Sequence, residues 1–128
     1  MVELRDEILR RPLGLTFSKE DLAAESTDIL IAAFEEERMV ACCVLTPQGK
    51  LSLRLRQMAV SKEAQGKGVG RAMIRFAETV ARDHGYPKVI MHARATALGF
   101  YEKMGYKVCG PEFVEVTIPH YIMEKALL

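Results

Sequence analysis

The apolar positions of this chain repeat with two different periods on either side of one glycine-rich segment. Between residues 51 and 60, apolar and polar residues alternate at first and the apolar ones then run together, which is typical of a β-strand. Downstream, the apolar residues recur every three or four positions, as in an amphipathic helix: Val69, Ala72, Met73, Phe76, Ala77, Val80 and Ala81. Residues 65–71 therefore join a predicted strand to the start of a predicted helix.

The remaining pattern predicts short elements of both kinds in a single domain, residues 1–128. We expect one short helix that stops near Pro12, and a second that Ser18 and Asp21 cap at its start. The expected helices are 3–11, 19–25, 68–84 and 95–104; the strands are 28–35, 39–46, 50–60, 88–93 and two closing strands; the turns are 36–38 and 46–49. This order predicts an α+β fold, a mixed sheet with helices on both faces.

The glycine-rich segment has the chemistry of an anion site. The first backbone N–H groups of a helix have no intrahelical partner, and they carry partial positive charge that suits a phosphate. Two common phosphate loops do not match. In the dinucleotide fingerprint the last glycine would fall on Arg71 or Met73, and in the P-loop the residue after Lys67 would be Ser or Thr rather than Gly68.

What the segment does match is Gln/Arg-x-x-Gly-x-Gly/Ala, with Gln65, Gly68 and Gly70 in the key places. It resembles the phosphate loop of the GNAT family of acetyl-CoA-dependent N-acetyltransferases; a glycine-rich turn without a ligand is the alternative. Residues 97–106 resemble the family's A-x-x-x-Y-x-K-x-G-F/Y element. Residues 9–15 and 115–125 resemble segments of one small-GNAT branch. The resemblance implies the GNAT acyl-CoA N-acyltransferase fold, with a mixed, mostly antiparallel sheet.

The resemblance also implies a binding site for acetyl-CoA. In the family, the loop's backbone N–H groups take the pyrophosphate, and the end of the preceding strand pairs with the pantetheine arm and points an N–H at the thioester carbonyl. Here Lys67 and Arg71 would add electrostatic attraction, or form a solvated basic pair. Arg94 stands where the family often has an asparagine that bonds the cofactor; it would reach a phosphate instead, or face the solvent. The expected cofactor-binding residues are Met58, Ala59, Val60, Gln65, Gly66, Lys67, Gly68, Val69, Gly70, Arg71, Arg94, Ala97 and Phe100.

By the same resemblance, Tyr101 places its hydroxyl near the sulfur of coenzyme A. A phenol has an ordinary pKa of about 10 and a thiol of about 8.5, so a hydrogen bond to the leaving sulfur is the safer description than full proton transfer. The alternative for Tyr101 is packing on the sheet. Some members carry a catalytic glutamate where this chain has Arg54. His120 or Glu115 is then the expected general base, or has a structural role; we interpret His92 as a packed or ligand-lining residue.

The function that this resemblance implies is transfer of an acetyl group from acetyl-CoA to an amine, by direct attack in a ternary complex. No cysteine has a histidine at a spacing that supports an acyl-enzyme. The acceptor is a small-molecule amine or a protein amino group. Two alternatives stay open: an acyl-CoA-binding sensor or interaction module without catalysis, and a nucleotide-binding domain stabilised by ATP or NAD.

The composition argues against nucleic acid and membrane as partners and favours the cytoplasm as the compartment. Eighteen basic and 17 acidic residues leave a formal net charge of +1, without the basic block that nucleic acid requires. The charged start and the lack of a long apolar run predict neither signal peptide nor membrane span. Three cysteines indicate reduced thiols in the cytoplasm, and no Cys/His spacing indicates a metal. A homodimer is one assembly that we consider. Family members usually begin with a strand, so the sheet here is expected to be one strand short or to pack differently at the N-terminus.

Overall fold

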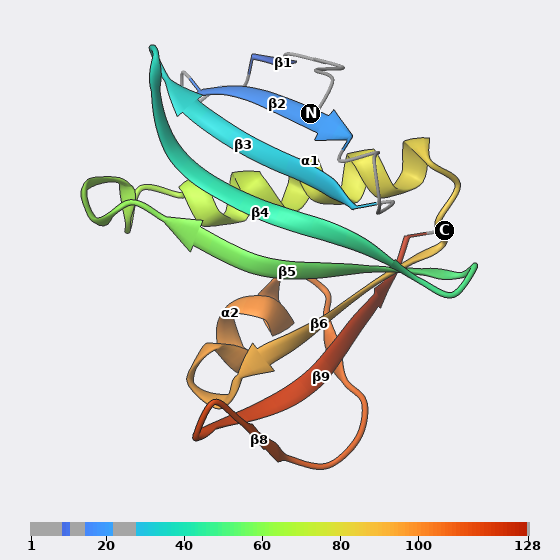
Figure 1. The fold of residues 1–128 in the computed structure, drawn as a ribbon. Coiled ribbons are helices and arrows are strands. Elements are labelled where there is room, and N and C mark those ends of the chain that lie inside the picture. The colour runs from blue at the N-terminus through green and yellow to red at the C-terminus, as the bar shows by residue number, and fades with distance from the viewer. Residues whose placement is uncertain (1–8, 11–14, 22–27, 128) are drawn as a thin grey trace.

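The computed structural model describes residues 9–10, 15–21 and 28–127 of the chain (Figure 1). Its strands are β1 (Leu9–Arg10), β2 (Leu15–Asp21), β3 (Ile29–Glu35), β4 (Arg38–Gln48), β5 (Ser52–Val60), β6 (Lys88–Arg94), β7 (Lys107–Val108), β8 (Phe113–Glu115) and β9 (Ile118–Ala126). Its helices are α1 (Val69–Asp83), α2 (Leu98–Lys103) and two 3-10 turns, η1 (Lys62–Ala64) and η2 (Ala95–Ala97).

The described strands form one sheet in the order β1-β2-β3-β4-β5-β6-β9-β7, with β8 paired to β9 (Figure 1). β5 and β6 run parallel because α1 carries the chain back between them, and the other described pairs are antiparallel. The mixed, mostly antiparallel sheet predicted from the sequence is therefore confirmed.

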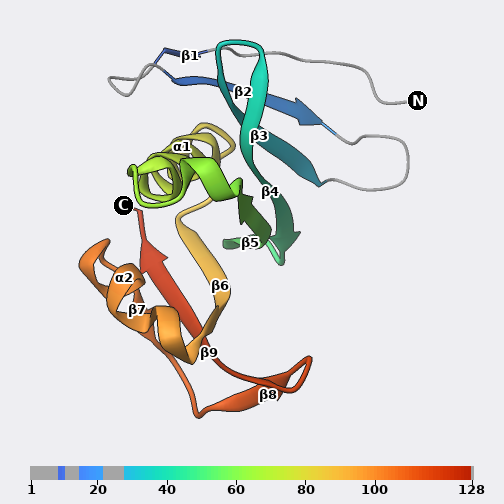
Figure 2. The ribbon, with the colours of Figure 1, turned by 90° about the vertical axis from the view of Figure 1, so that its left-hand side faces the viewer.

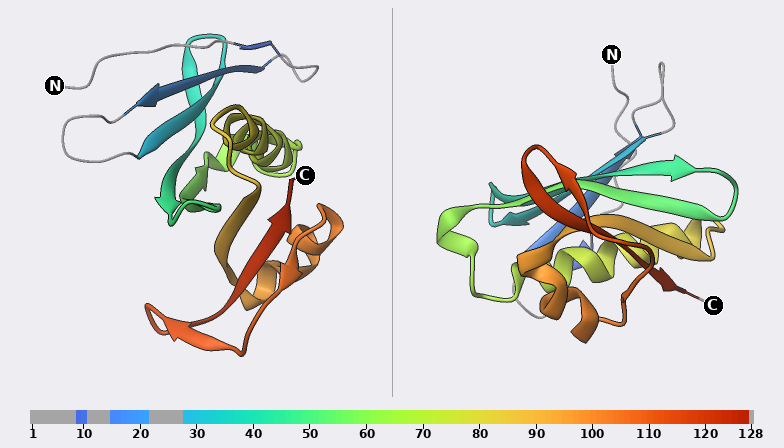
Figure 3. Two further views of the ribbon diagram at one scale, coloured as in Figure 1. Left: turned by 90° about the vertical axis from the view of Figure 1, so that its right-hand side faces the viewer. Right: turned by 90° about the horizontal axis from the view of Figure 1, so that it is seen from below.

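The core lies between this sheet and α1. The apolar stripe of α1 buries Met73, Phe76 and Val80, and β5 contributes Leu53 and Leu55 from alternate positions to the same cluster. Figures 2 and 3 show α2 on the same side of the sheet as α1. The polar positions of β5 and β6 consequently face the opposite side, which neither described helix covers.

The edge of the sheet nearest the N-terminus departs from the sequence prediction. Leu9 and Arg10 pair with Phe17 and Thr16 as strands, where we expected part of the helix at residues 3–11. Ser18 lies within β2 opposite Ala32, so the predicted cap, and the helix at 19–21, are wrong. The physical reason is the two-residue alternation of buried Phe17 and Lys19, which suits a strand beside β3. Residues 3–8, 11 and 22–25 of the predicted helices lie outside the described residues.

The predicted turn at residues 46–49 is also displaced. β4 continues through Pro47, which pairs with Leu53, and the chain turns at residues 49–51, where Gly49 has a φ of 74°. Proline has no N–H to give to a ladder, and it is tolerated here because the recorded pairing of β3 with β4 ends at Leu45. The strand that we placed at 50–60 accordingly starts at Ser52.

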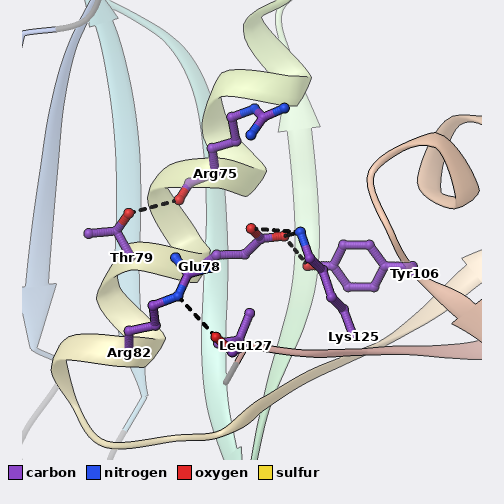
Figure 4. Close-up of polar contacts among 7 residues, drawn as sticks. All are labelled: Arg75, Glu78, Thr79, Arg82, Tyr106, Lys125 and Leu127. Atoms are coloured by element: carbon purple, nitrogen blue, oxygen red, sulfur yellow. Dashed lines mark hydrogen bonds and ion pairs between the residues drawn. The ribbon is translucent and has the colours of Figure 1, made fainter.

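A buried carboxylate joins α1 to the last strand. Glu78 is 3% exposed; Tyr106 donates a hydrogen bond to its Oε2 at 2.9 Å, and Lys125 Nζ lies 3.1 Å from its Oε1 (Figure 4). The cation and the hydroxyl replace water around the charge, which would otherwise be costly to bury. Glu78 therefore fastens α1 to β9 and to the segment that follows α2.

We predict that Lys125→Met destabilises the fold by about 2–4 kcal/mol, because it leaves the Glu78 charge buried without its cation. Lys88→Met is the matched control: its ion pair with Glu124 is more than a third exposed on both sides, and such a pair contributes about 0–1 kcal/mol. Urea denaturation followed by circular dichroism measures both. Equal losses in the two variants would contradict the role given to Glu78.

Candidate functional site

The strands β5 and β6 pair over only four residues and then separate (Figure 1). Pairing ends at Leu55 and Met91, although β5 continues to Val60. In the same stretch β5 carries a bulge: residues 57 and 58 together oppose Cys43 of β4, and Gln57 has a φ of 52°. A bulge bends its strand and increases its twist. The end of β5 thereby follows β4 and leaves β6, which opens the sheet.

A groove of about 710 Å³ fills this opening. Several of the residues predicted from the sequence line it: Met58, Ala59, Val60, Gln65, Arg94, Ala97, Tyr101, Glu115 and His120. The remaining lining residues are Arg54, Leu55, Arg56, Gln57, Met91, His92, Ala93 and Val116. The opening thus gathers residues from β5, β6, α2 and the β8–β9 hairpin around one space.

One wall of the groove is a strand edge. Ala59 and Val60 pair with Cys42 and Ala41 of β4 on one side, and no pairing with β6 is recorded beyond Leu55 on the other. Backbone N–H and C=O groups at such an edge can bind an extended ligand as an additional strand would.

The glycine segment lies at the end of this strand edge. Gly68 has a φ of 82° and precedes α1 without any side-chain cap, and the first turn of α1 contains no acidic residue. The hydrogen bond from Ala72 N–H to Gly68 C=O, 3.1 Å long, starts the helix, so the N–H groups of residues 69–71 have no intrahelical partner. Gln65 ties the segment to β5 by donating to Val60 C=O at 3.2 Å.

Gly70 brings α1 close to the strand edge. A Cβ at this position would lie 3.3 Å from Met58 Cε and 3.9 Å from Phe100 Cζ. The helix N-terminus therefore lies close to both β5 and α2, with room for no side chain larger than a methyl group unless its neighbours move.

The other predicted residues of the segment point elsewhere. Lys67 and Val69 line a second hollow of about 210 Å³ with Glu35 and Arg38, and Arg71 is exposed. The residues that do not line the large groove are Gly66, Lys67, Gly68, Val69, Gly70, Arg71 and Phe100, and they flank it on the loop and on the two helices.

Tyr101 lies between apolar packing and the groove. Its ring contacts those of Phe100 and Tyr106, with centroids 5.0 and 6.1 Å away. Burial, and next the thiol of Cys43, raise the pKa of Tyr101, while burial raises the pKa of Cys43 to about 12. Tyr101 therefore keeps its proton at neutral pH and can donate it in a hydrogen bond.

His120 is buried, its ring contacts that of Phe113, and it lines the groove. Its Nδ1 lies 2.7 Å from Ile118 C=O, and a carbonyl can only accept, so the proton sits on Nδ1. In the neutral ring, Nε2 then has a lone pair that can take a proton. This geometry is compatible with the predicted base, whose role stays a prediction.

A cluster that the sequence did not predict as a unit lies on the side of the groove away from α1. Arg54 Nη2 and Glu115 Oε1 each lie 2.9 Å from the same atom, His92 Nδ1. The hydrogen bond with His92 is the main cause of a lowered pKa for Glu115, so that carboxyl is ionised at neutral pH and is a weak base. The sequence had pointed to these residues one by one, Glu115 as a candidate base, His92 as a packed or ligand-lining residue and Arg54 at the place of the family's glutamate, but it gave no sign that they contact one another.

Neither a metal site nor a membrane-spanning helix is present in the described residues. In residues 9–10, 15–21 and 28–127 no group of three His, Cys, Asp or Glu side chains is placed to hold a metal ion. No helix in that part of the chain is both long and apolar enough to span a membrane.

The sequence and the fold are similar to those of known acetyltransferases. The family model described as "Acetyltransferase (GNAT) domain" matches residues 16–127. The uncharacterized protein YyaT of Bacillus subtilis (strain 168) is 30% identical over 74 residues, which are 58% of this chain and 50% of that protein. The match thus spans about half the length of this curated relative.

Solved structures agree with that match. The crystal structure of a presumed N-acetyltransferase from Lactobacillus plantarum superposes with a TM-score of 0.76 at 28% identity, covering 80% of this chain and 70% of that one. A GNAT family acetyltransferase from Elizabethkingia anophelis with acetyl-CoA bound gives 0.73 at 13% identity, covering 88% and 98%, and so bears on the fold alone.

We predict that His92→Gln raises the pKa of Glu115 toward its ordinary 4.5, because the substitution removes the imidazole hydrogen bond. A lowered pKa in the folded protein stabilises it above the ordinary value, and this contribution disappears as the pH falls through the lowered pKa. Carboxyl ¹³C NMR titration measures the shift. His84→Gln, at the distant end of α1, is the control and should leave Glu115 unchanged; an unchanged pKa in His92→Gln would contradict the contact.

Proposed function

This chain belongs to the family of GNAT acetyltransferases, and on that premise we propose that it transfers the acetyl group of acetyl-CoA to an amine by direct attack in a ternary complex. The observation that carries the proposal is the opening between β5 and β6, whose strand edge leads directly to an uncapped helix N-terminus. Acetyl-CoA has the matching chemistry: a diphosphate, an extended arm with amide groups, and a thioester at its end.

The segment of residues 65–71 is the proposed pyrophosphate site. Free N–H groups at the start of α1 suit an anion, and the closeness of the helix to Met58 and Phe100 at Gly70 sets those groups against the strand. Lys67 and Arg71 add positive charge on the exposed side of the loop. The edge formed by Met58, Ala59 and Val60 pairs with the arm, and one of its N–H groups stabilises the negative charge that develops on the thioester carbonyl.

Tyr101 is the proposed hydrogen-bond donor to the departing sulfur. Its raised pKa supports this assignment, since a phenol that keeps its proton can donate at neutral pH. The amine nitrogen attacks the carbonyl carbon, the carbon–sulfur bond breaks, and the nitrogen gives up a proton. His120 Nε2 is the proposed acceptor of that proton. Glu115 is the weaker candidate because its pKa is lowered.

The partner of the reaction is an amine, either a small molecule or an amino group of a protein. We further propose a single-domain enzyme that works in the cytoplasm, as a monomer or a homodimer. Its three cysteines, Cys42, Cys43 and Cys109, are free thiols, which suits a reducing compartment.

We predict that Tyr101→Phe lowers kcat by about 10²-fold while the affinity for acetyl-CoA changes little, since only the hydrogen bond to sulfur is removed. Stopped-flow detection of free thiol across a panel of amines gives kcat, and calorimetry gives the affinity. Tyr86→Phe, distant from the groove lining, is the control.

Two outcomes would count against the assignment of Tyr101. Wild-type turnover in Tyr101→Phe at saturating substrates would show that the hydroxyl is dispensable. Tight binding of acetyl-CoA without thiol release from any amine, in the wild type as in the variant, would instead identify a non-catalytic acyl-CoA-binding module.

We also predict a graded loss of acetyl-CoA affinity at Gly70. Gly70→Ala meets only the flexible end of Met58 and should cost less than about threefold, whereas Gly70→Val pushes α1 from the strand and should cost about tenfold or more. Gly99→Ala, whose Cβ meets nothing within 4 Å, is the matched control. Calorimetric titration with acetyl-CoA measures all three, and unchanged affinity in Gly70→Val would place the ligand elsewhere.

A further inference from the structure

In the cluster of Arg54, His92 and Glu115, two side chains with opposite hydrogen-bonding needs contact the same nitrogen atom. An arginine can only donate hydrogen bonds and an ionised glutamate can only accept them. Both groups contact His92 Nδ1 at 2.9 Å, and that nitrogen is either a donor or an acceptor at any moment. It can satisfy Glu115 or Arg54, but never the two together.

The contact with Glu115 is the favourable one, because an ionised carboxylate has no proton of its own to give and needs the donor that His92 Nδ1–H supplies. An ionised carboxylate is stabilised when His92 Nδ1–H donates to it, and this leaves Arg54 Nη2 facing a nitrogen that has no lone pair to offer. Arg54 has a second unmet need: its Nε is buried and has no hydrogen-bond partner among the residues that the structure describes. The guanidinium is thus under-satisfied at two of its nitrogens, Nε and Nη2.

The surroundings of Arg54 offer it little negative charge. Three arginines line the groove, Arg54, Arg56 and Arg94, against the single carboxylate of Glu115. Arg56 donates to Thr46 Oγ1 at 3.3 Å, and Arg94 is exposed near the end of β6. Arg54 alone combines a groove-lining position, a buried Nε and a contested contact.

Arg54 also lies on the side of the sheet away from Tyr101 and α1. Leu53 and Leu55 pack into the core beneath α1, so the side chain between them points to the opposite face. The proposed coenzyme site occupies the helix side of the opening. A molecule that approaches the thioester from the other face therefore enters the part of the groove that Arg54 lines.

We propose that the acceptor amine carries a carboxylate, and that Arg54 binds it. A carboxylate offers two oxygens to the guanidinium fork, and Arg54 can present two neighbouring nitrogens to them once its side chain turns from His92 toward the groove. Binding there would withdraw Arg54 from His92 and leave the imidazole to Glu115. This inference rests on the proposed acetyl transfer and adds the substrate class.

The test compares amines that differ only in the carboxylate. 5-Aminopentanoate and 5-aminopentanamide differ only at the end of the chain opposite the reacting amine. The basicity of the two amines is therefore similar. A second arm uses two short peptides with lysine beside either aspartate or asparagine, which separates a protein source of the carboxylate from a small molecule. We expect kcat/KM to favour the carboxylate member of at least one pair by about 10- to 100-fold.

Variants assign that preference to Arg54. Arg54→Gln should abolish the discrimination, because kcat/KM falls for the carboxylate member of the pair and stays the same for the amide. Arg54→Lys should keep part of the discrimination, because it retains the positive charge but not the guanidinium fork. Arg75→Gln, on the exposed face of α1, is the charge-matched control and should discriminate as the wild type does. Circular dichroism establishes that each variant is folded.

A second measurement does not need turnover. In the presence of coenzyme A, N-acetyl-5-aminopentanoate should bind more tightly than its amide by calorimetry. The ¹⁵N signal of His92 Nδ1 should move on binding in the wild type and stay in Arg54→Gln.

The outcomes separate the two proposals. Binding of acetyl-CoA, or thiol release, without discrimination in either pair and without preferential binding of the acetylated acid would overturn this inference alone. Absence of both acetyl-CoA binding and thiol release would overturn the proposed function, and the acceptor class with it.

Discussion

The site of this protein depends on the early separation of two parallel strands. β5 and β6 share only residues 52–55 and 88–91, and the bulge at Gln57 then turns β5 toward β4. A sheet paired to its end would have no strand edge in its interior and no groove. The backbone geometry of a few residues thus creates the groove, and the side chains that line it determine its chemistry.

Two different environments meet in this opening. On the helix side, apolar packing raises the pKa of Tyr101 and of Cys43, so both remain protonated near a helix N-terminus that favours anions. On the other side lie Arg54, His92 and Glu115, a charged cluster that shares one nitrogen. An acyl donor and an amine acceptor approaching from opposite faces would each find chemistry suited to them.

Sequence periodicity predicted the central strands and helix, but it failed at β2, where a helix-cap pattern and a strand pattern coincide. β5 begins with strict alternation, α1 keeps a helical period throughout, and the glycines at 68 and 85 mark both ends of α1. Ser18 and Asp21 have the spacing of a helix cap, but they lie in a segment whose buried residues alternate by two, and pairing with β3 decides in favour of the strand. The contact of Arg54 with His92 joins residues 38 positions apart through strand register, which no local pattern encodes.

Backbone ¹⁵N NMR with increasing coenzyme A tests the central claim most directly, because it locates the ligand without requiring an acceptor. The largest shifts should fall on the N–H groups of residues 58–60 and 66–71, on either side of the point where β5 and β6 part. Shifts confined to other parts of the chain, or none at millimolar coenzyme A, would contradict the account.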